Sequence, residues 1–147
     1  QGKSQYLGRA VDQDGDVLDI LVQSRKDKRA VKRLFRKLLK RQKRVPIAMT
    51  TDKLRSYAAA KREMMPSVVH RQDKYANNRA EVSHEHTREQ ERQMRGFASS
   101  AQAQRFLSVH GQVHNLFRVG RHLLRAANYR LLLGRAFAVW QEVTCVQ

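Results

Sequence analysis

Two acidic residues of this 147-residue chain stand where α/β proteins place reactive carboxylates. Asp52 follows a short β-rich run, Ile47 to Thr51. A carboxylate at the carboxyl end of a strand can point into the crevice in which α/β sheets place their sites. Glu81 stands near the start of a basic helical segment that Asn77 and Asn78 open. The two carboxylates are therefore the first candidates for a reactive site.

Each carboxylate also has a structural role open to it. Asp52 precedes a helical stretch that begins at Lys53, and an aspartate there could cap the amino end of the helix. Glu81 lies three residues after Asn78, a position at which a glutamate stabilises the first turn of a helix. Residue type and spacing alone leave both roles open for each carboxylate.

A histidine and three arginines follow Glu81 at helical spacings. His84 shares the helix face of Glu81, so it could orient a phosphate or could be a partly buried, hydrogen-bonded side chain. Arg88, Arg92 and Arg95, at spacings of four and three, could aim guanidinium groups at a phosphate backbone. The alternative is a solvated helix face with intrahelical ion pairs.

The first third of the chain predicts a β-hairpin, a helix and a strand. The β-rich runs Tyr6–Val11 and Val17–Val22 flank an Asp-Gly turn signal. The amphipathic stretch Asp27–Lys40 predicts a helix with an apolar stripe, and Lys and Arg fill its other face. Ser24, three residues before this stretch, completes the form of a capping box. With Ile47–Thr51 as the next strand, the order predicts a βαβ-type crossover onto one sheet.

The rest of the chain predicts mainly helices. One further strand is expected at Val68–Arg71, and Pro66 stops the helix before it. Ala98-Ser99-Ser100 is linker-like. Helices are expected at Lys53–Met64, from Asn78 to about Arg95, and at Ala101–Phe117, His122–Leu133 and Ala136–Val143.

Composition indicates a polyanionic partner. Lys and Arg number 30 against 13 Asp and Glu, a net charge of 30 − 13 = +17. Nucleic acid is the first candidate partner and an anionic membrane surface the second. Hydrophobic residues make up 41% of the chain, enough for a core, and no apolar run is long enough to span a membrane. One cysteine, Cys145, excludes an intrachain disulfide and fits a reducing cytoplasm.

An ordered series of motifs resembles DDE transposases of bacterial insertion sequences, of the insertion-sequence-six type. The segment Tyr6–Gly15 resembles their second-strand motif, and Thr51-Asp52-Lys53 with Tyr57 resembles their second-aspartate motif. Asn77-Asn78-Arg79-Ala80-Glu81 is similar to the family's approach to its catalytic glutamate. Further similar segments are His70-Arg71-Gln72, Ser83-His84, Thr87-Arg88, Glu91–Arg95, Gln102–Ser108 and Arg121–Leu124.

The resemblance implies a ribonuclease-H-like mixed sheet flanked by helices. Residues 1–147 would form one partial catalytic domain, with the sheet and catalytic helix in 1–97 and a helical tail in 98–147. It also implies an Asp-Asp-Glu triad that binds two magnesium ions, in which Asp52 and Glu81 are the second and third acids and are metal ligands. The residues expected to bind DNA are Lys53, His84, Arg88, Arg92 and Arg95. The expected partners are transposon-end and target DNA and, in the full-length protein, a second copy, in a bacterial cytoplasm close to the nucleoid.

The chain departs from the family pattern at its amino end. The family's first aspartate lies on the strand before the Tyr6 motif, in positions that would precede Gln1, so we expect that strand to be missing and this chain alone to be inactive. Gly8 stands where the family usually has Trp, and Gly120 stands in a normally basic run. Two functions are therefore open. One is magnesium-dependent DNA cleavage and strand transfer with the missing part supplied. The other is non-catalytic DNA binding by a basic remnant.

Overall fold

The computed structural model describes residues 4–72, 78–120 and 123–145, except for the side chains of a few residues between positions 79 and 86 in the third helix. The chain divides into two compact units, Gln1–Ser108 and Val109–Gln147. The described residues form a mixed α/β structure with five helices and two small sheets. This composition is compatible with the expected ribonuclease-H-like class.

The first unit begins with the predicted hairpin. Strand β1 (Tyr6–Val11) pairs antiparallel with β2 (Val17–Gln23), and the register shifts between Ala10 and Val11. In the turn, one carboxylate oxygen of Asp12 accepts the backbone amides of Asp14 and Asp16, each at 2.9 Å. Gly15 has a φ of 88°, a conformation that glycine adopts without steric cost. The Asp12 carboxylate is thus engaged in holding the turn.

The two faces of the hairpin contact different helices, because side chains alternate along a strand. Val17 and Ile20, on one face, form a core cluster with Leu107 of α4 (Ser100–Phe117). Gly8 is on the other face, where an added Cβ would lie 3.0 Å from a methyl carbon of Leu34 in the first long helix. Glycine at position 8 therefore permits a close approach of that helix.

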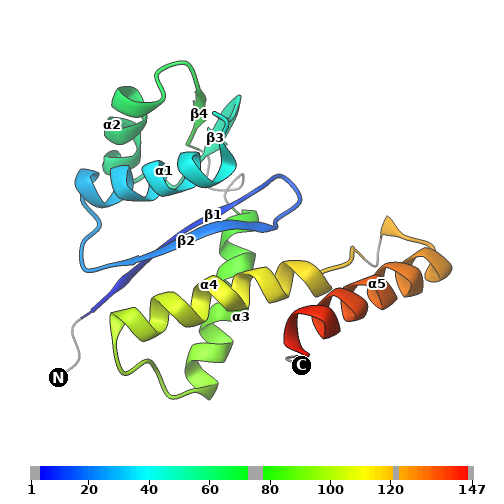
Figure 1. The fold of residues 1–147 in the computed structure, drawn as a ribbon. Coiled ribbons are helices and arrows are strands. Elements are labelled where there is room, and N and C mark those ends of the chain that lie inside the picture. Colours follow the sequence, from blue (N-terminus) through cyan, green and yellow to red (C-terminus); the bar gives the residue numbers. More distant parts are fainter. Residues whose placement is uncertain (1–3, 73–77, 121–122, 146–147) are drawn as a thin grey trace. The chain divides into compact units, whose positions relative to one another are not determined.

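Helix α1 (Lys28–Gln42) lies beside the hairpin (Figure 1). Asp27 is its N-cap, since its carboxylate accepts the backbone amide of Ala30 at 2.8 Å. The predicted capping box, with Ser24 as the N-cap and Asp27 three residues later, is wrong. Asp27 itself is the N-cap, three residues further along the chain. At the other end Lys43 is left-handed, with a φ of 53°, and donates its amide to the carbonyl of Leu39.

The predicted crossover is found one element later than expected. Strand β3 (Ala48–Thr50) leads into α2 (Arg55–Met64), and β4 (Val69–Arg71) then pairs parallel with β3. Neither strand pairs with the hairpin, so the prediction that the chain crosses from β2 through α1 onto one common sheet is wrong for the described residues. Hydrophobic periodicity identifies strands, but pairing depends on which edges meet.

Helix α1 also packs against this βαβ unit. Val31 and Phe35 form a buried cluster with Ala60 of α2 and with Met65 and Val68 from the α2–β4 connection. The α2 helix ends at Met64, just before Pro66, as the sequence predicts. One helix therefore contributes to both the hairpin side and the βαβ side of the unit.

Helix α3 (Asn78–Gln93) ends in a reversal of the chain. Arg95 and Gly96 are both left-handed, with φ of 57° and 91°, and the Gly96 amide donates to the carbonyl of Glu91. Ala98 and Ser99 of the predicted linker-like stretch lie in the connection between α3 and α4, and Ser100 begins α4. The hydroxyl of Ser99 accepts the amide of Gln102 at 3.1 Å, and the Gln102 side chain accepts the Ala98 amide at 2.7 Å.

In the second unit, residues 109–117 of α4 precede α5 (Ala126–Thr144). The prediction of two helices that meet near Gly134 is wrong, because α5 runs through that glycine. A helical glycine costs only about 1 kcal/mol relative to alanine, whereas Phe117 contacts both Phe137 and Trp140 at ring-centroid distances of 5.1 and 6.1 Å. Within the described residues, no helix is long and apolar enough to cross a membrane.

Candidate acidic site and basic surfaces

Asp52 lies two residues after the end of β3, at the carboxyl end of the parallel pair, and its side chain is exposed. Its Oδ1 accepts the backbone amide of Leu54 at 3.2 Å, which forms a short turn. Helix α2 begins at Arg55 with Leu54 as its N-cap and has no side-chain cap. Asp52 therefore does not cap the helix, and the structural alternative raised for it is not found.

Thr51 and His70 hold the end of β3 against β4. The buried Thr51 hydroxyl donates to the carbonyl of Asp52 at 2.9 Å and lies 2.8 Å from Nε2 of His70. Because that hydroxyl has one proton, Nε2 of His70 must be the donor in the second contact. Burial, and then the charge of Lys61, lower the pKa of His70, which favours the neutral ring. The backbone before Asp52 is thus tied to the neighbouring strand.

Tyr57 connects this loop to the core. Its ring lies 6.1 Å from that of Phe35 in α1, measured between centroids. Burial raises the pKa of the Tyr57 phenol, and the negative charge of Asp52 raises it further. The phenol is therefore neutral at physiological pH, close enough to Asp52 to experience its charge. Sequence comparison pointed to Tyr57 only as part of a motif; its packing role depends on α1.

Glu81 lies in the first part of α3, and its side chain is outside the described residues. Its role as the third acid stays a prediction. One turn on, His84 is half-buried, and its pKa is lowered to about 4 by burial first, then by the charges of Arg9 and Arg88. A neutral ring at pH 7 offers a phosphate no positive charge. Nearby, Arg9 of β1 donates to the hydroxyl of the buried Thr87, which ties α3 to the hairpin.

The predicted DNA-binding cations are exposed but do not form one row. Lys53 stands in the Asp52 turn, while Arg88 and Arg92 are on α3, where Arg92 Nε donates to the carbonyl of Arg88 at 3.3 Å. Helix α3 ends at Gln93, so the left-handed Arg95 is not on the helix face that its spacing predicted. Whether these side chains contact DNA stays a prediction.

The described residues do not assemble a metal site. Within the part of the chain whose placement is described, no three His, Cys, Asp or Glu side chains are grouped closely enough to hold a metal ion. Asp52 is a single exposed carboxylate at the carboxyl end of the β3–β4 pair. A magnesium site would need further acids beyond those that the described side chains bring together.

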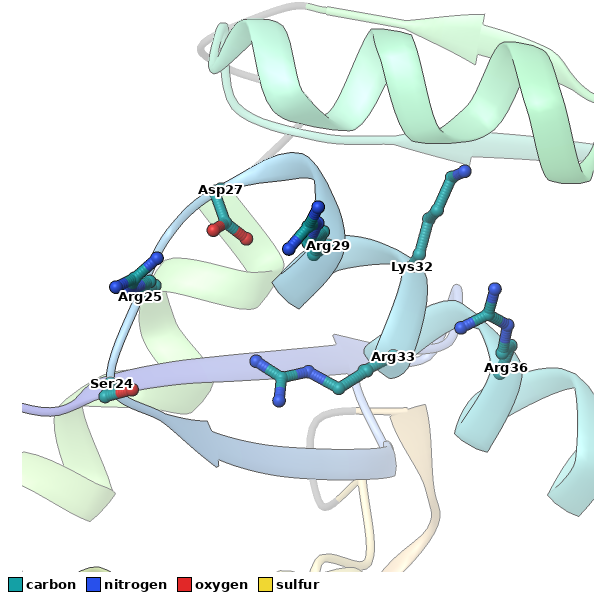
Figure 2. Close-up of a pocket in the computed structure, with 7 residues that line it drawn as sticks. All are labelled: Ser24, Arg25, Asp27, Arg29, Lys32, Arg33 and Arg36. Carbon is teal, nitrogen blue, oxygen red and sulfur yellow. The ribbon is translucent and has the colours of Figure 1, made fainter.

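A basic groove lies on α1, on residues that sequence reasoning treated only as the polar face of the helix. It has a volume of about 540 Å³ and is lined by Ser24, Arg25, Asp27, Arg29, Lys32, Arg33 and Arg36 (Figure 2). A second hollow of about 310 Å³ shares Ser24 and Arg33 with it and reaches Gln5 and Ser100. The two hollows are therefore neighbours at the end of β2.

These features define a mixed α/β domain with an exposed acid at a strand end and a strongly basic surface. The chain matches the family model described as the DDE domain over residues 1–120 of its 147 residues. It therefore belongs to the DDE-domain family of transposases. No curated protein and no solved structure matches the chain.

Proposed function

We propose that this chain is part of the catalytic domain of a bacterial transposase of the insertion-sequence-six type, which cleaves DNA and joins it to a target. Asp52 and Glu81 are the second and third acids of its triad. The observation that supports this proposal most directly is the position and environment of Asp52. This residue is exposed at the carboxyl end of β3, does not cap α2, and has one hydrogen bond of 3.2 Å to its carboxylate.

The local structure suits a fixed acid. Thr51, buried and hydrogen-bonded to His70, holds the backbone immediately before Asp52, and the Tyr57 packing against Phe35 holds the helix after it. Magnesium, when bound by such carboxylates, would polarise the phosphodiester and activate the attacking oxygen. The proposal needs a further carboxylate from outside these residues, together with transposon ends, target DNA and a second copy of the protein as partners in the bacterial nucleoid.

The test is a strand-cleavage and strand-transfer assay in the intact protein, with DNA that contains the element's own ends. Asp52→Asn and Glu81→Gln should each lower the rate roughly 100-fold or more, the scale of loss when one preorganised stabiliser of developing charge is removed. DNA affinity should change little. Asp14→Asn in the hairpin turn and Glu85→Gln one turn along α3 are matched controls, because both side chains are exposed. Full activity in either site variant would overturn the assignment of that residue.

The second candidate is a DNA-binding domain without catalysis. It is favoured by the basic groove on α1. The same assay separates the two, because the binding-only function predicts no magnesium-dependent cleavage in the intact protein and unchanged DNA retention in both site variants.

A further inference from the structure

Helix α1 divides its positive charges between two uses. Eight of its 15 residues are Lys or Arg, and none is acidic. Lys28 and Lys32 form ion pairs with Glu63 of α2. On another side, Lys37 and Arg41 lie 2.9 and 3.6 Å from Oδ1 of the buried Asp19 of β2. These four cations hold the helix against its neighbours.

A second set of cations near and on α1 forms no ion pair with a described carboxylate. Arg29, Arg33 and Arg36 are exposed, at spacings of four and three along α1, and Arg25 stands just before the helix. Among the described residues, no carboxylate forms an ion pair with any of the four. We call these four residues the arginine face. Lys40, four residues after Arg36, extends the row, so Arg29 to Lys40 spans about 16 Å at 1.5 Å per residue.

The arginine face lines the groove rather than a flat surface. In Figure 2, Arg33 extends from α1 back toward Ser24, while Lys32 points away toward α2, in agreement with its ion pair to Glu63. The lining contains five cations and one anion, a sum of 5 − 1 = +4. The anion, Asp27, accepts the Ala30 amide with one oxygen and offsets one of the five positive charges of the lining.

Such a surface selects for a ligand with repeated, closely spaced negative charge. Arginine binds phosphate through two parallel N–H groups, and its charge persists at every physiological pH. Double-stranded DNA presents about one negative charge per 1.7 Å of its axis, so a row of about 16 Å can meet several phosphates. The side chains are all charged and exposed, which fits backbone contact rather than reading of bases.

We propose that the arginine face, Arg25, Arg29, Arg33 and Arg36, binds the phosphate backbone of double-stranded DNA. This surface shares no residue with the acidic candidates Asp52 and Glu81 or with the basic residues predicted on α3. The choice of DNA as the polyanion rests on the proposed function. The surface itself rests on the unpaired arginines and the groove.

The test is binding of the full chain to a 25-base-pair duplex of mixed sequence, measured by fluorescence anisotropy across a salt series. The variant is Arg29→Gln/Arg33→Gln/Arg36→Gln. The matched control is Arg125→Gln/Arg130→Gln/Arg135→Gln on and before α5, which also lowers the net charge from +17 by three and alters only exposed side chains. Circular dichroism confirms that each variant folds, and Arg33→Gln alone replaces the triple variant if it does not.

If each arginine neutralises one phosphate, the log–log salt dependence of the binding constant should become shallower by about 2.7 in the triple variant. Affinity at about 0.1 M salt should fall roughly 10- to 500-fold. Arg33→Gln alone should reduce the slope by about 1. The control should keep a slope close to that of the unmodified chain.

Two other results would overturn the inference in distinguishable ways. Equal slopes for the variant and the control, with firm DNA binding by the unmodified chain, would place the DNA elsewhere and leave the proposed function intact. No duplex binding by the unmodified chain, with binding to vesicles of anionic lipid or to an RNA duplex, would remove both the inference and the DNA partner of the proposed function.

Discussion

Helices α1 and α3 both contact the hairpin, yet their charges differ in sign. Helix α1 has eight basic residues and no acidic ones, whereas α3 has three arginines and four glutamates, a sum of 3 − 4 = −1. Helix α1 buries Ala30, Val31, Leu34 and Phe35, while α3, among its described side chains, buries Thr87. The excess charge of the chain is therefore concentrated on the helix that is best anchored, and away from the helix that contains the candidate acid Glu81.

This difference shows that the most basic helix of a domain need not be the helix that contains a candidate catalytic residue. Sequence reasoning placed DNA contacts beside Glu81, where the resemblance indicated catalysis. In the structure, the largest set of cations without ion pairs is on α1, among the residues that are described. A helix with a firm apolar base can keep several like charges in one place, because its packing offsets their repulsion.

The largest effect expected from the comparison concerns packing. Phe35→Ala in α1 removes a side chain that is 3% exposed and should lower the free energy of unfolding by about 3–5 kcal/mol. Val82→Ala in α3, where the side chain is 52% exposed, should change it by less than about 0.5 kcal/mol. Urea denaturation followed by circular dichroism measures both. Similar losses would show that the two helices are equally anchored.

The next effect is a pH dependence that belongs to α3. The pKa of His84 is lowered to about 4 in the folded chain, against about 6.5 when unfolded. The unfolded chain therefore takes up a proton first, and stability should fall as pH decreases from about 6.5 to 4, by at most about 1.4 kcal/mol per pH unit and less where water reaches the ring. His84→Gln should flatten this part of the stability profile. An unchanged profile in the variant would assign the acid sensitivity to other groups.

The smallest effect separates capping from charge at the start of α1. Asp27→Ala removes the N-cap and should cost about 1 kcal/mol of stability. Asp27→Ser retains a capping oxygen, so stability should be nearly unchanged. Both variants remove the one anion of the groove and should increase DNA affinity by a few-fold at low salt. Tighter binding in neither variant would argue that DNA does not approach this groove.

Much of the local structure could be predicted from the sequence. The alternation in Tyr6–Val11 matches β1 residue for residue, and the apolar stripe of α1 is the face that becomes buried. The resemblance to DDE transposases agrees with the family match over residues 1–120. These features depend on neighbours within a few residues, where backbone preference and side-chain periodicity decide the outcome.

Other predictions failed where a choice depended on distant partners. The crossover joins β3 to β4 instead of β2 to β3, and α5 continues through Gly134 because Phe137 and Trp140 contact Phe117. The candidate acidic site was also predicted only in part. The sequence pointed to Asp52 as a candidate, but only the contacts of Thr51, His70 and Tyr57 show how the loop around it is held.

By itself, the sequence determined most of the helices and strands but not the single helix α5, and it determined the basic excess of +17 and the family to which the chain belongs. Only the tertiary structure decided which cations form ion pairs within the protein and which do not. Lys28, Lys32, Lys37 and Arg41 carry the same positive charge as the residues of the arginine face, and only the placement of Glu63 and Asp19 in space shows that these four are paired. An ion pair requires two charges within a few ångströms, and residues from different elements reach that distance only when packing brings them together.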